Sequence, residues 1–300
     1  MKPREETPTY ELADHLFRHE SGKMISVITG MHGPQSLQLA EDVVQESLVR
    51  ALNTWPYRGI PANPAAWLMT TAKNLAIDRL RRDSNFLRKQ TEIVAEIETY
   101  ESPVEVNDDE IQDSQLRLMF ACCHPTLPPE SQSALALKTL CGFSPAEIAR
   151  AFLISEAAVS KRLTRARQRI EKEGIPFEIP SGPDLPLRLD GVLEILYLLF
   201  NEGHKASYGE EMIRTDICEE AIRLGMILAI HPAGDEPRTH ALLALMCLTA
   251  ARLPARIDAK GNLVRLEDQD RTLWDSQLIQ TGMHHLSKSG KGEQLGEYHL

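Results

Sequence analysis

The stretch SPAEIARAFLISEAAVSKRLTRARQRI, residues 144–170, predicts two short helices joined by a tight turn. Ser144 and Glu147 stand at the spacing of a capping box, and Pro145 suits the first helical position. Ser155 can cap a second helix after a short interruption. This order of caps, helices and turn predicts a helix-turn-helix, which the rest of the chain is expected to support.

The second helix has two contrasting sides. Its predicted buried side consists of Val159, Leu163, Ala166 and Ile170, which recur at helical spacing. The opposite side is small at its start and cationic further along, and it carries Ala157, Ser160, Lys161, Thr164, Arg165 and Gln168. Short side chains let a helix approach base edges in a major groove, and long cations reach guanines or phosphates. We therefore predict DNA contacts from Ser160, Lys161, Arg162, Thr164 and Arg165, with Arg167 and Arg169 strengthening the attraction to phosphates. The alternative is a solvated basic helix packed on a neighbour.

The segment GFSPAEIARAFLISEAAVSKRLTRARQRI (142–170) resembles region 4 of the sigma-70 family of RNA polymerase sigma factors, in particular its small extracytoplasmic-function (ECF) group. The resemblance implies that the five predicted DNA contacts read the minus-35 promoter element. Leu153 stands where the family often has glycine, so a Cβ must be accommodated in the turn.

Composition bounds the class of protein. The chain has 300 residues, of which 42% are hydrophobic and 25% charged, so we expect a globular protein of roughly two domains or more. No apolar run approaches the roughly 20 residues of a membrane span, and the N-terminus lacks the apolar core of a signal peptide. We therefore expect a cytoplasmic protein without a membrane partner, whose five cysteines are reduced thiols.

The net charge of −10 is unevenly distributed. Residues 91–113 hold nine acidic residues and no Lys or Arg, and residues 184–300 hold 18 acidic against 12 basic residues. The rest of the chain is therefore basic. The acidic overall charge therefore does not exclude nucleic-acid binding by the basic parts of the chain.

Two helices are expected between residues 12 and 52, separated by the break HGPQS (32–36). In the second helix Leu39, Val43 and Leu48 can face the core, while a largely acidic side that includes Glu41 remains outside. The segment LAEDVVQESLVRAL (39–52) resembles sigma region 2.2, the helix that docks on core RNA polymerase. The resemblance implies that the polymerase-binding residues are Asp42, Gln45, Glu46 and Val49.

Prolines and a glycine in residues 56–64 predict irregular backbone before a long helix that Asn63 caps and that runs past Arg82. This helix interleaves cations with Trp67, a combination that can hold the backbone and bases of an unstacked strand. A core position for Trp67 is an equal alternative. The block NPAAWLMTTAKNLAIDRLRR (63–82) resembles sigma regions 2.3 and 2.4, which open and capture the minus-10 element. The resemblance implies this role for Trp67, Lys73, Asn74, Arg79 and Arg82.

Residues 91–115 are dense in like charge and are expected to form a flexible acidic linker. The following helices should support the helix-turn-helix. Cys122, Cys123 and His124 stand together, but no second pair at zinc-site spacing accompanies them. We therefore expect small core residues and no metal.

A proline-rich boundary leads into a third helical unit. Its apolar stripes are Leu189, Val192, Leu193, Leu196 and Leu199; Ile217, Ala221, Leu224 and Leu228; and Leu242, Leu245 and Met246. The blocks LYLLFNEGHKAS (196–207) and LEDQDRTLWD (266–275) resemble the C-terminal extension of one ECF subgroup, in which tetratricopeptide-like helices can follow. No 34-residue repeat is visible, and truncation of the chain at its C-terminus is one hypothesis. We expect FNEGH to form a turn and the histidines at 284 and 285 to lie in a solvated tail. The alternative is that both line a pocket in this third unit.

The sequence contains no Gly-rich phosphate loop, H-E-x-x-H motif or nucleophile elbow, so we expect no enzyme, no catalytic residue and no cofactor. We predict an all-α protein with sigma region 2 in residues 1–90, the linker in 91–115, sigma region 4 in 116–176 and the helical extension in 184–300. The resemblance implies core RNA polymerase and promoter DNA as partners, and it leaves room for an anti-sigma factor or other regulatory protein. The alternative function is a ligand-responsive regulator that binds an operator through its helix-turn-helix without polymerase. Such a regulator has no need of the blocks that begin at residues 39 and 63.

Overall fold

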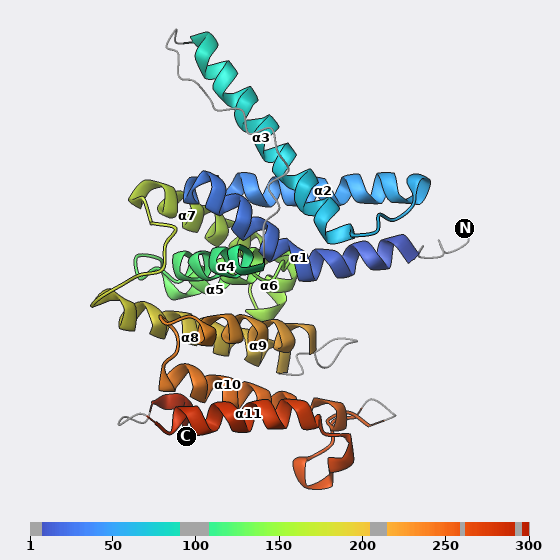
Figure 1. Ribbon diagram of the computed structural model, residues 1–300, viewed down its shortest axis with the longest axis vertical. Coiled ribbons are helices and arrows are strands. Elements are labelled where there is room, and N and C mark those ends of the chain that lie inside the picture. The colour runs from blue at the N-terminus through green and yellow to red at the C-terminus, as the bar shows by residue number, and fades with distance from the viewer. Residues whose placement is uncertain (1–7, 91–107, 205–214, 259–261, 292–295, 300) are drawn as a thin grey trace. The chain divides into compact units, whose positions relative to one another are not determined.

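The protein is all-α, as the sequence predicts (Figure 1). The computed structural model describes residues 8–90, 108–204, 215–258, 262–291 and 296–299. Within these ranges the extended pairing is limited to one isolated antiparallel bridge between Ile257 and Leu263. Internal contacts divide the chain into two compact units. The first comprises Met1–Cys122, Ala134–Ala149 and Ile154–Glu178, and the second comprises Cys123–Ser133, Arg150–Leu153 and Ile179–Leu300.

The first unit begins with α1 (Pro8–His32), the 3-10 turn η1 (Pro34–Ser36) and α2 (Leu37–Arg58). Gly33 has a φ of 85°, which a residue without a Cβ adopts readily, and it forms the predicted break. One expectation is wrong, because α2 continues through Pro56 to Arg58. A proline removes only one N–H donor, and the helix still closes through the Gly59 N–H to the Trp55 carbonyl at 2.9 Å.

Helix α3 (Pro64–Gln90) follows and runs past Arg82, as predicted. The Asn63 Oδ1 caps it by accepting a hydrogen bond from the Ala66 N–H at 3.0 Å. Leu68, Ala72 and Leu75 bury the side that faces the core of this unit. The C-terminal half of α3 projects away from α1 and α2 (Figure 1).

The chain continues with α4 (Asp108–Cys122), α5 (Pro129–Thr139), α6 (Pro145–Ala151) and α7 (Glu156–Glu173). The first unit includes all of α4 and α7, and α5 and α6 except for the residues assigned to the second unit. Residues 91–107 of the predicted linker lie outside the described residues. Residues 108–115, also assigned to the linker, are instead the first turns of α4. Helix formation is favoured there because α4 buries Leu116, Met119 and Phe120 and packs against α1.

The second unit contains α8 (Asp184–His204), α9 (Thr215–Ile230), α10 (Pro237–Ala250) and α11 (Ser276–Ser289). Short 3-10 turns join or follow them: η2 (Leu253–Ala255), η3 (Leu266–Asp268), η4 (Arg271–Leu273) and η5 (Glu297–His299). Consecutive helices pack on one another, and the three predicted stripes are buried except for Leu245, which is 39% exposed. Leu245 lies about 100° round the helix from the buried Met246. No described helix combines the length and apolar character of a membrane span.

Candidate functional site

The helix-turn-helix forms through the predicted caps. The Glu147 N–H donates to the Ser144 Oγ at 3.2 Å, and the Ser144 N–H donates to the Glu147 carboxylate at 2.8 Å. The Ser155 Oγ then accepts from the Ala158 N–H at 3.2 Å and starts α7. Between the helices, Leu153 has a φ of 52° and a side chain that is 90% exposed. A residue with a Cβ therefore occupies the left-handed region in this turn.

Helix α7 has the two sides that the sequence predicts. Val159, Leu163, Ala166 and Ile170 are buried. Among the predicted minus-35 residues, Ser160, Lys161, Thr164 and Arg165 are exposed and Arg162 is half-buried. The Thr164 hydroxyl donates to the Ser160 carbonyl at 2.9 Å, so this threonine is held close to the helix backbone. The exposed side of α7 thus has short residues near its start and cations further along, as the sequence predicts.

On α2, the predicted polymerase-binding residues occupy one polar side. Gln45 and Val49 are exposed, and Asp42 and Glu46 are half-buried. Asp42 accepts a hydrogen bond from the Gln38 amide at 2.8 Å. The 54% exposure of Val49 leaves an apolar side chain uncovered within this otherwise polar side.

Arg79 connects two of the predicted groups. Its guanidinium lies 2.7 Å from the Glu46 carboxylate and 3.6 Å from the Asp42 carboxylate. The hydrogen bond from Arg79, aided by Arg50, holds the pKa of Glu46 below its ordinary value. Arg79, which is predicted to contact the minus-10 element, is therefore paired with Asp42 and Glu46, which are predicted to contact polymerase.

The other predicted minus-10 residues differ in accessibility. Trp67 is half-buried and meets the ring of Trp55 edge-on, with ring centroids 5.5 Å apart. One edge of Trp67 thus packs inside, as the core alternative predicts, and part of the ring remains accessible. Asn74 and Arg82 are exposed, whereas Lys73 is only 8% exposed. A contact from Lys73 to DNA would require its side chain to move.

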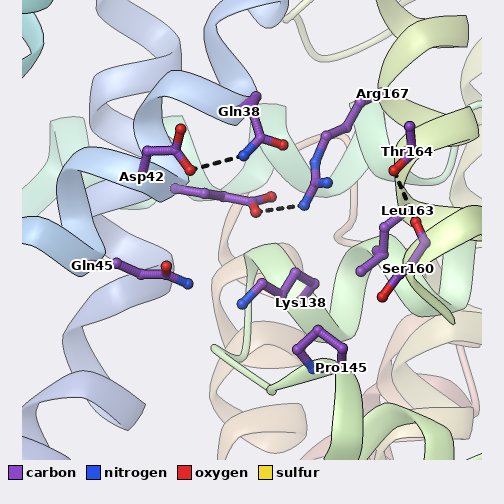
Figure 2. A pocket seen from close by; sticks show the side chains of 10 residues that line it. Gln38, Asp42, Gln45, Lys138, Pro145, Ser160, Leu163, Thr164 and Arg167 are labelled. Atoms are coloured by element: carbon purple, nitrogen blue, oxygen red, sulfur yellow. Dashed lines mark hydrogen bonds and ion pairs between the residues drawn. The ribbon is translucent and has the colours of Figure 1, made fainter. Parts of the chain in front are cut away.

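A polar cavity of about 230 Å³ lies between α2 and α7 (Figure 2). Helix α2 contributes Gln38, Glu41, Asp42 and Gln45, and α7 contributes Ser160, Leu163, Thr164 and Arg167; Lys138 and Pro145 complete the lining. The cavity therefore brings two predicted polymerase contacts to two predicted minus-35 contacts. No local sequence pattern indicates this juxtaposition.

An ion pair beside the cavity joins α2 to α7. The Arg167 guanidinium lies 2.5 Å from the Glu41 carboxylate, and Glu41 is only 4% exposed. Burial raises the pKa of Glu41, although Arg167 opposes this shift. Burial likewise lowers the pKa of Lys138, which is 8% exposed. One expectation is therefore wrong, because Glu41 is not on the outer side of α2. Arg167, which is predicted to strengthen the attraction to phosphates, is paired with this carboxylate.

Glu41 and Arg167 could have been recognised from helical spacing. Glu41 lies four residues after Leu37 and three before Val44, both of which are buried. Arg167 stands in the same relation to Leu163 and Ile170. A charged residue within an apolar stripe requires a partner, so this spacing was the available signal.

The Cys122 thiol at the end of α4 is structural in character. Cys122 is fully buried, and its sulfur lies 3.4 Å from the Thr139 hydroxyl. Burial raises the pKa of the Cys122 thiol to about 12, which disfavours the reactive thiolate. Among the described residues, no cluster of three or more His, Cys, Asp or Glu side chains is arranged to hold a metal ion.

Two expectations about histidines are wrong. His285 lies in α11, is 7% exposed and places its Nδ1 2.9 Å from the Nδ1 of His240. His240 in turn contacts the Asp235 carboxylate at 2.7 Å through its Nε2. Burial, followed by the nearby His240, His284 and Lys288, lowers the pKa of His285 to about 4. The FNEGH segment is the end of α8, where His204 contacts Arg256 and stacks on Phe200.

Three known protein families match three separate segments of the chain. Sigma-70 region 2 matches residues 16–86, sigma-70 region 4 matches residues 117–170, and a family of unknown function (DUF6596) matches residues 188–290. We refer below to residues 16–86 as the region 2 segment and to residues 117–170 as the region 4 segment. No solved structure matches the chain.

Relatives match over different parts of the chain. An uncharacterized protein of Rhizobium meliloti is 42% identical over 270 residues, which cover 89% of this chain and 63% of that protein. This chain thus spans less than two thirds of the length of that relative. The ECF RNA polymerase sigma factor SigL of Mycobacterium tuberculosis is 35% identical over 41% of this chain and 68% of its own length. The ECF RNA polymerase sigma-E factor of Haemophilus influenzae is 32% identical over 45% of this chain and 75% of its own length.

These matches and the helix-turn-helix define the class of protein as a sigma-70 factor, a class of transcription initiation factors that act without enzymatic chemistry of their own. Within that class the chain belongs to the ECF RNA polymerase sigma factors. It carries a helical extension of the DUF6596 family after its region 4 segment. The assignment favours the sigma-factor prediction over an operator-binding regulator.

Proposed function

We propose that this ECF sigma factor binds core RNA polymerase through the polar side of α2, reads the minus-35 element with α7 and captures the minus-10 element with α3. The observation that carries the proposal is the exposed side of α7. This side combines the short side chains of Ser160 and Thr164 with the long cationic side chains of Lys161 and Arg165. A major groove about 12 Å wide admits an α-helix, and short residues allow its close approach. Long cations can then contact guanines or phosphates.

Removal of Lys161 or Arg165 tests the minus-35 assignment. We expect Lys161→Ala and Arg165→Ala each to weaken promoter binding by about 1 to 3 kcal/mol if a base contact is lost. Arg169→Ala is a matched control on the same exposed side, and it should mainly reduce the salt dependence, because a phosphate contact carries no sequence information. The measurement is holoenzyme affinity for promoter and scrambled duplexes over a range of salt. Unchanged promoter affinity in the Lys161→Ala, Arg165→Ala double variant would refute the groove assignment.

The polymerase surface is best tested away from Arg79. Charge reversal at Asp42 and Glu46 would also break their pairing with α3, so loss of binding would have two explanations. Gln45 and Val49 are exposed. We therefore expect Gln45→Arg combined with Val49→Arg to reduce co-purification with core polymerase at least tenfold, because two cations replace a polar and an apolar contact.

Tyr57→Arg provides the control, since Tyr57 is 89% exposed at the end of the same helix and lies outside the predicted contacts. Equal co-purification of the Gln45→Arg, Val49→Arg double variant and the unmodified chain would show that polymerase binds elsewhere.

A further inference from the structure

We infer that the helical extension contains a binding site for the phosphate group of a small molecule, formed by the side chains of His204, Arg252 and Arg256. The site lies where the C-terminal end of α8 contacts the segment around the 3-10 turn η2, which follows α10. None of the three residues belongs to the predicted polymerase or promoter contacts, so the inference does not depend on the proposed function.

The backbone around η2 holds both arginines in place. Arg252 directly precedes this turn and Arg256 directly follows it. Leu253 and Ala255 within the turn are buried. The Arg256 N–H donates to the Leu253 carbonyl at 3.1 Å, and the Arg256 carbonyl accepts from the Val264 N–H at 2.9 Å. The two side chains therefore extend from a fixed backbone, which lowers the entropy cost of ordering them on a ligand.

Arg256 also has a defined side-chain partner. Its guanidinium contacts the Nε2 of His204. A guanidinium can only donate, so Nε2 accepts and the proton of the neutral imidazole lies on Nδ1. The His204 ring stacks on Phe200, with centroids 5.8 Å apart and ring planes inclined by 18°, and Phe200 is buried. Arg256 is thus oriented by an imidazole that is itself fixed against the core of the second unit.

The site carries positive charge without a balancing carboxylate. Arg252 and Arg256 are half-buried, and no described carboxylate forms an ion pair with either of them. Burial, followed by the charge of Arg252, lowers the pKa of Arg256. Burial, followed by both guanidiniums, lowers the pKa of His204 to about 4, so the imidazole adds no charge near neutral pH. Two positive charges therefore stand in a partly desolvated position, where an anion would stabilise them.

The Cys218 thiol does not supply the missing negative charge. Its Sγ donates to the Phe200 carbonyl at 3.6 Å and is buried beside α8. Burial raises the pKa of this thiol to about 12, although Arg256 opposes the shift. Cys218 is therefore a neutral thiol at physiological pH.

Charge and donor geometry together favour a phosphate group as the ligand. Planar guanidiniums bind carboxylate or phosphate oxygens through pairs of N–H donors. A carboxylate would balance only one of the two positive charges, whereas a phosphate monoester carries about −1.5 to −2 charges at pH 7. Its three terminal oxygens can each accept from a different side chain: Arg252, Arg256 and the Nδ1–H of His204.

Titration of inorganic phosphate into the full chain tests the site, with acetate as the singly charged comparison at equal ionic strength. Phosphate can also bind to the cations of α7, so the readout must be local. Hydrogen exchange resolved by peptide provides it. We expect phosphate, but not acetate, to increase the protection of residues 196–204 and 252–258. If neither segment gains protection over the whole titration, the inference is overturned.

Arginine substitutions show whether the guanidiniums carry the binding. Arg256→Lys keeps the charge but loses the paired donors, so it should raise the half-saturating phosphate concentration about tenfold. Arg265→Lys is the matched control, since Arg265 lies in the same unit, is exposed and has Glu267 at 3.8 Å. Arg252→Gln provides a second variant in case Arg256→Lys disturbs the packing of α8 without phosphate. An unchanged phosphate response in Arg252→Gln would overturn the site.

Two substitutions test His204 as the residue that positions Arg256. His204→Gln keeps an acceptor for Arg256 and a donor for the ligand, so most of the phosphate response should remain. His204→Phe keeps an aromatic ring against Phe200 but has no acceptor, so the response should weaken. An equal response in His204→Phe and the unmodified chain would overturn the role of His204 in the site.

A last variant separates this site from the promoter-reading surface. The Lys161→Ala, Arg165→Ala double variant, which should weaken promoter binding, is expected to retain the phosphate response of residues 196–204 and 252–258. If this variant loses the response, phosphate acts through α7 and the inferred site falls while the proposed function stands. If promoter binding is unaffected and the local response persists, the proposed groove assignment falls and the phosphate site stands.

Discussion

Two helix pairs, α2 with α7 in the first unit and α10 with α11 in the second, each bury ionisable side chains in different surroundings. Between α2 and α7 the buried groups are the oppositely charged Glu41 and Arg167, and a polar cavity lies beside them. Between α10 and α11 the imidazoles of His240 and His285 stack with centroids 5.0 Å apart. Next to them Gly282 brings α11 so close to α10 that a Cβ would lie 2.7 Å from the Leu248 Cγ.

The difference indicates which helix pair can separate at moderate cost. A cavity forfeits dispersion contacts, and a buried ion pair returns hydration when it is exposed, so the α2–α7 pair loses little on opening. The α10–α11 pair is closely packed. Its separation would expose apolar surface and would not restore the hydration of an ion pair. We therefore expect the first pair to respond to binding partners and the second to remain intact in every functional state.

The largest expected effect is overpacking of the α10–α11 pair. Gly282→Leu should destabilise the second unit by about 3 kcal/mol, because its side chain would overlap Leu248 and Cys247. Gly290→Ala is the control, since its nearest atoms would lie 3.9 Å from the new Cβ. Hydrogen exchange resolved by peptide measures the effect, which should appear in α10 and α11. Normal protection of these helices in Gly282→Leu would show that they can separate as easily as α2 and α7.

A smaller effect is expected from acid. The pKa of His285 is lowered to about 4, so between this value and its ordinary 6.5 the unfolded chain binds a proton that the folded chain does not. The stability contribution is therefore complete above pH 6.5 and is lost as the pH falls towards 4. The full fall of the pKa from 6.5 to about 4 corresponds to about 3.5 kcal/mol at roughly 1.4 kcal/mol per unit, and solvent screening reduces this to about 2 kcal/mol. Urea unfolding at several pH values should show this loss.

Two variants separate His285 from other acid effects. His285→Gln should remove the pH-dependent part, whereas His284→Gln, at the exposed neighbouring position, should retain most of it, because burial is the largest cause of the shift and His284 a smaller one. The raised pKa of Glu41 acts with the opposite sign, because its folded form holds the proton longer and loses stability as the pH rises. A difference curve here is the free energy of unfolding of the unmodified chain minus that of the variant, plotted against pH. If the Glu41→Gln and His285→Gln curves change in the same direction as the pH falls, this contrast between the two helix pairs is contradicted.

The sequence predicted the local features of both units more fully than their contacts. The caps at Ser144, Ser155 and Asn63 are local hydrogen bonds over three residues, so residue type and spacing predict them directly. The buried side of α7 likewise follows from a repeat within one helix. Fold class and family could therefore be predicted from short segments.

Contacts between distant segments could not be predicted in the same way. Glu41 meets Arg167 across 126 positions and His240 meets His285 across 45, and no local pattern specifies such a pairing. The acidic neighbours of Glu41 resemble a solvated surface, so the local pattern predicts a polar side for it. Its place in the stripe of Leu37 and Val44 indicates burial, but the partner depends on how the segments pack. A local repeat thus predicts which residues are exposed on α7, whereas it does not predict the cavity that Ser160 and Thr164 line.

The smallest expected effect concerns the turn between α6 and α7. Leu153 has a φ of 52°, a region that costs an L-residue with a Cβ roughly 1–2 kcal/mol, and glycine would remove this strain while losing more chain entropy on folding. Leu153→Gly should therefore stabilise the folded chain by about 0.5 to 1 kcal/mol, measured by urea unfolding. Leu153→Ala keeps the Cβ and removes only the exposed apolar side chain, so it should give no gain. Equal stabilisation by alanine and glycine would mean that the exposed side chain, and not the backbone, carries the cost.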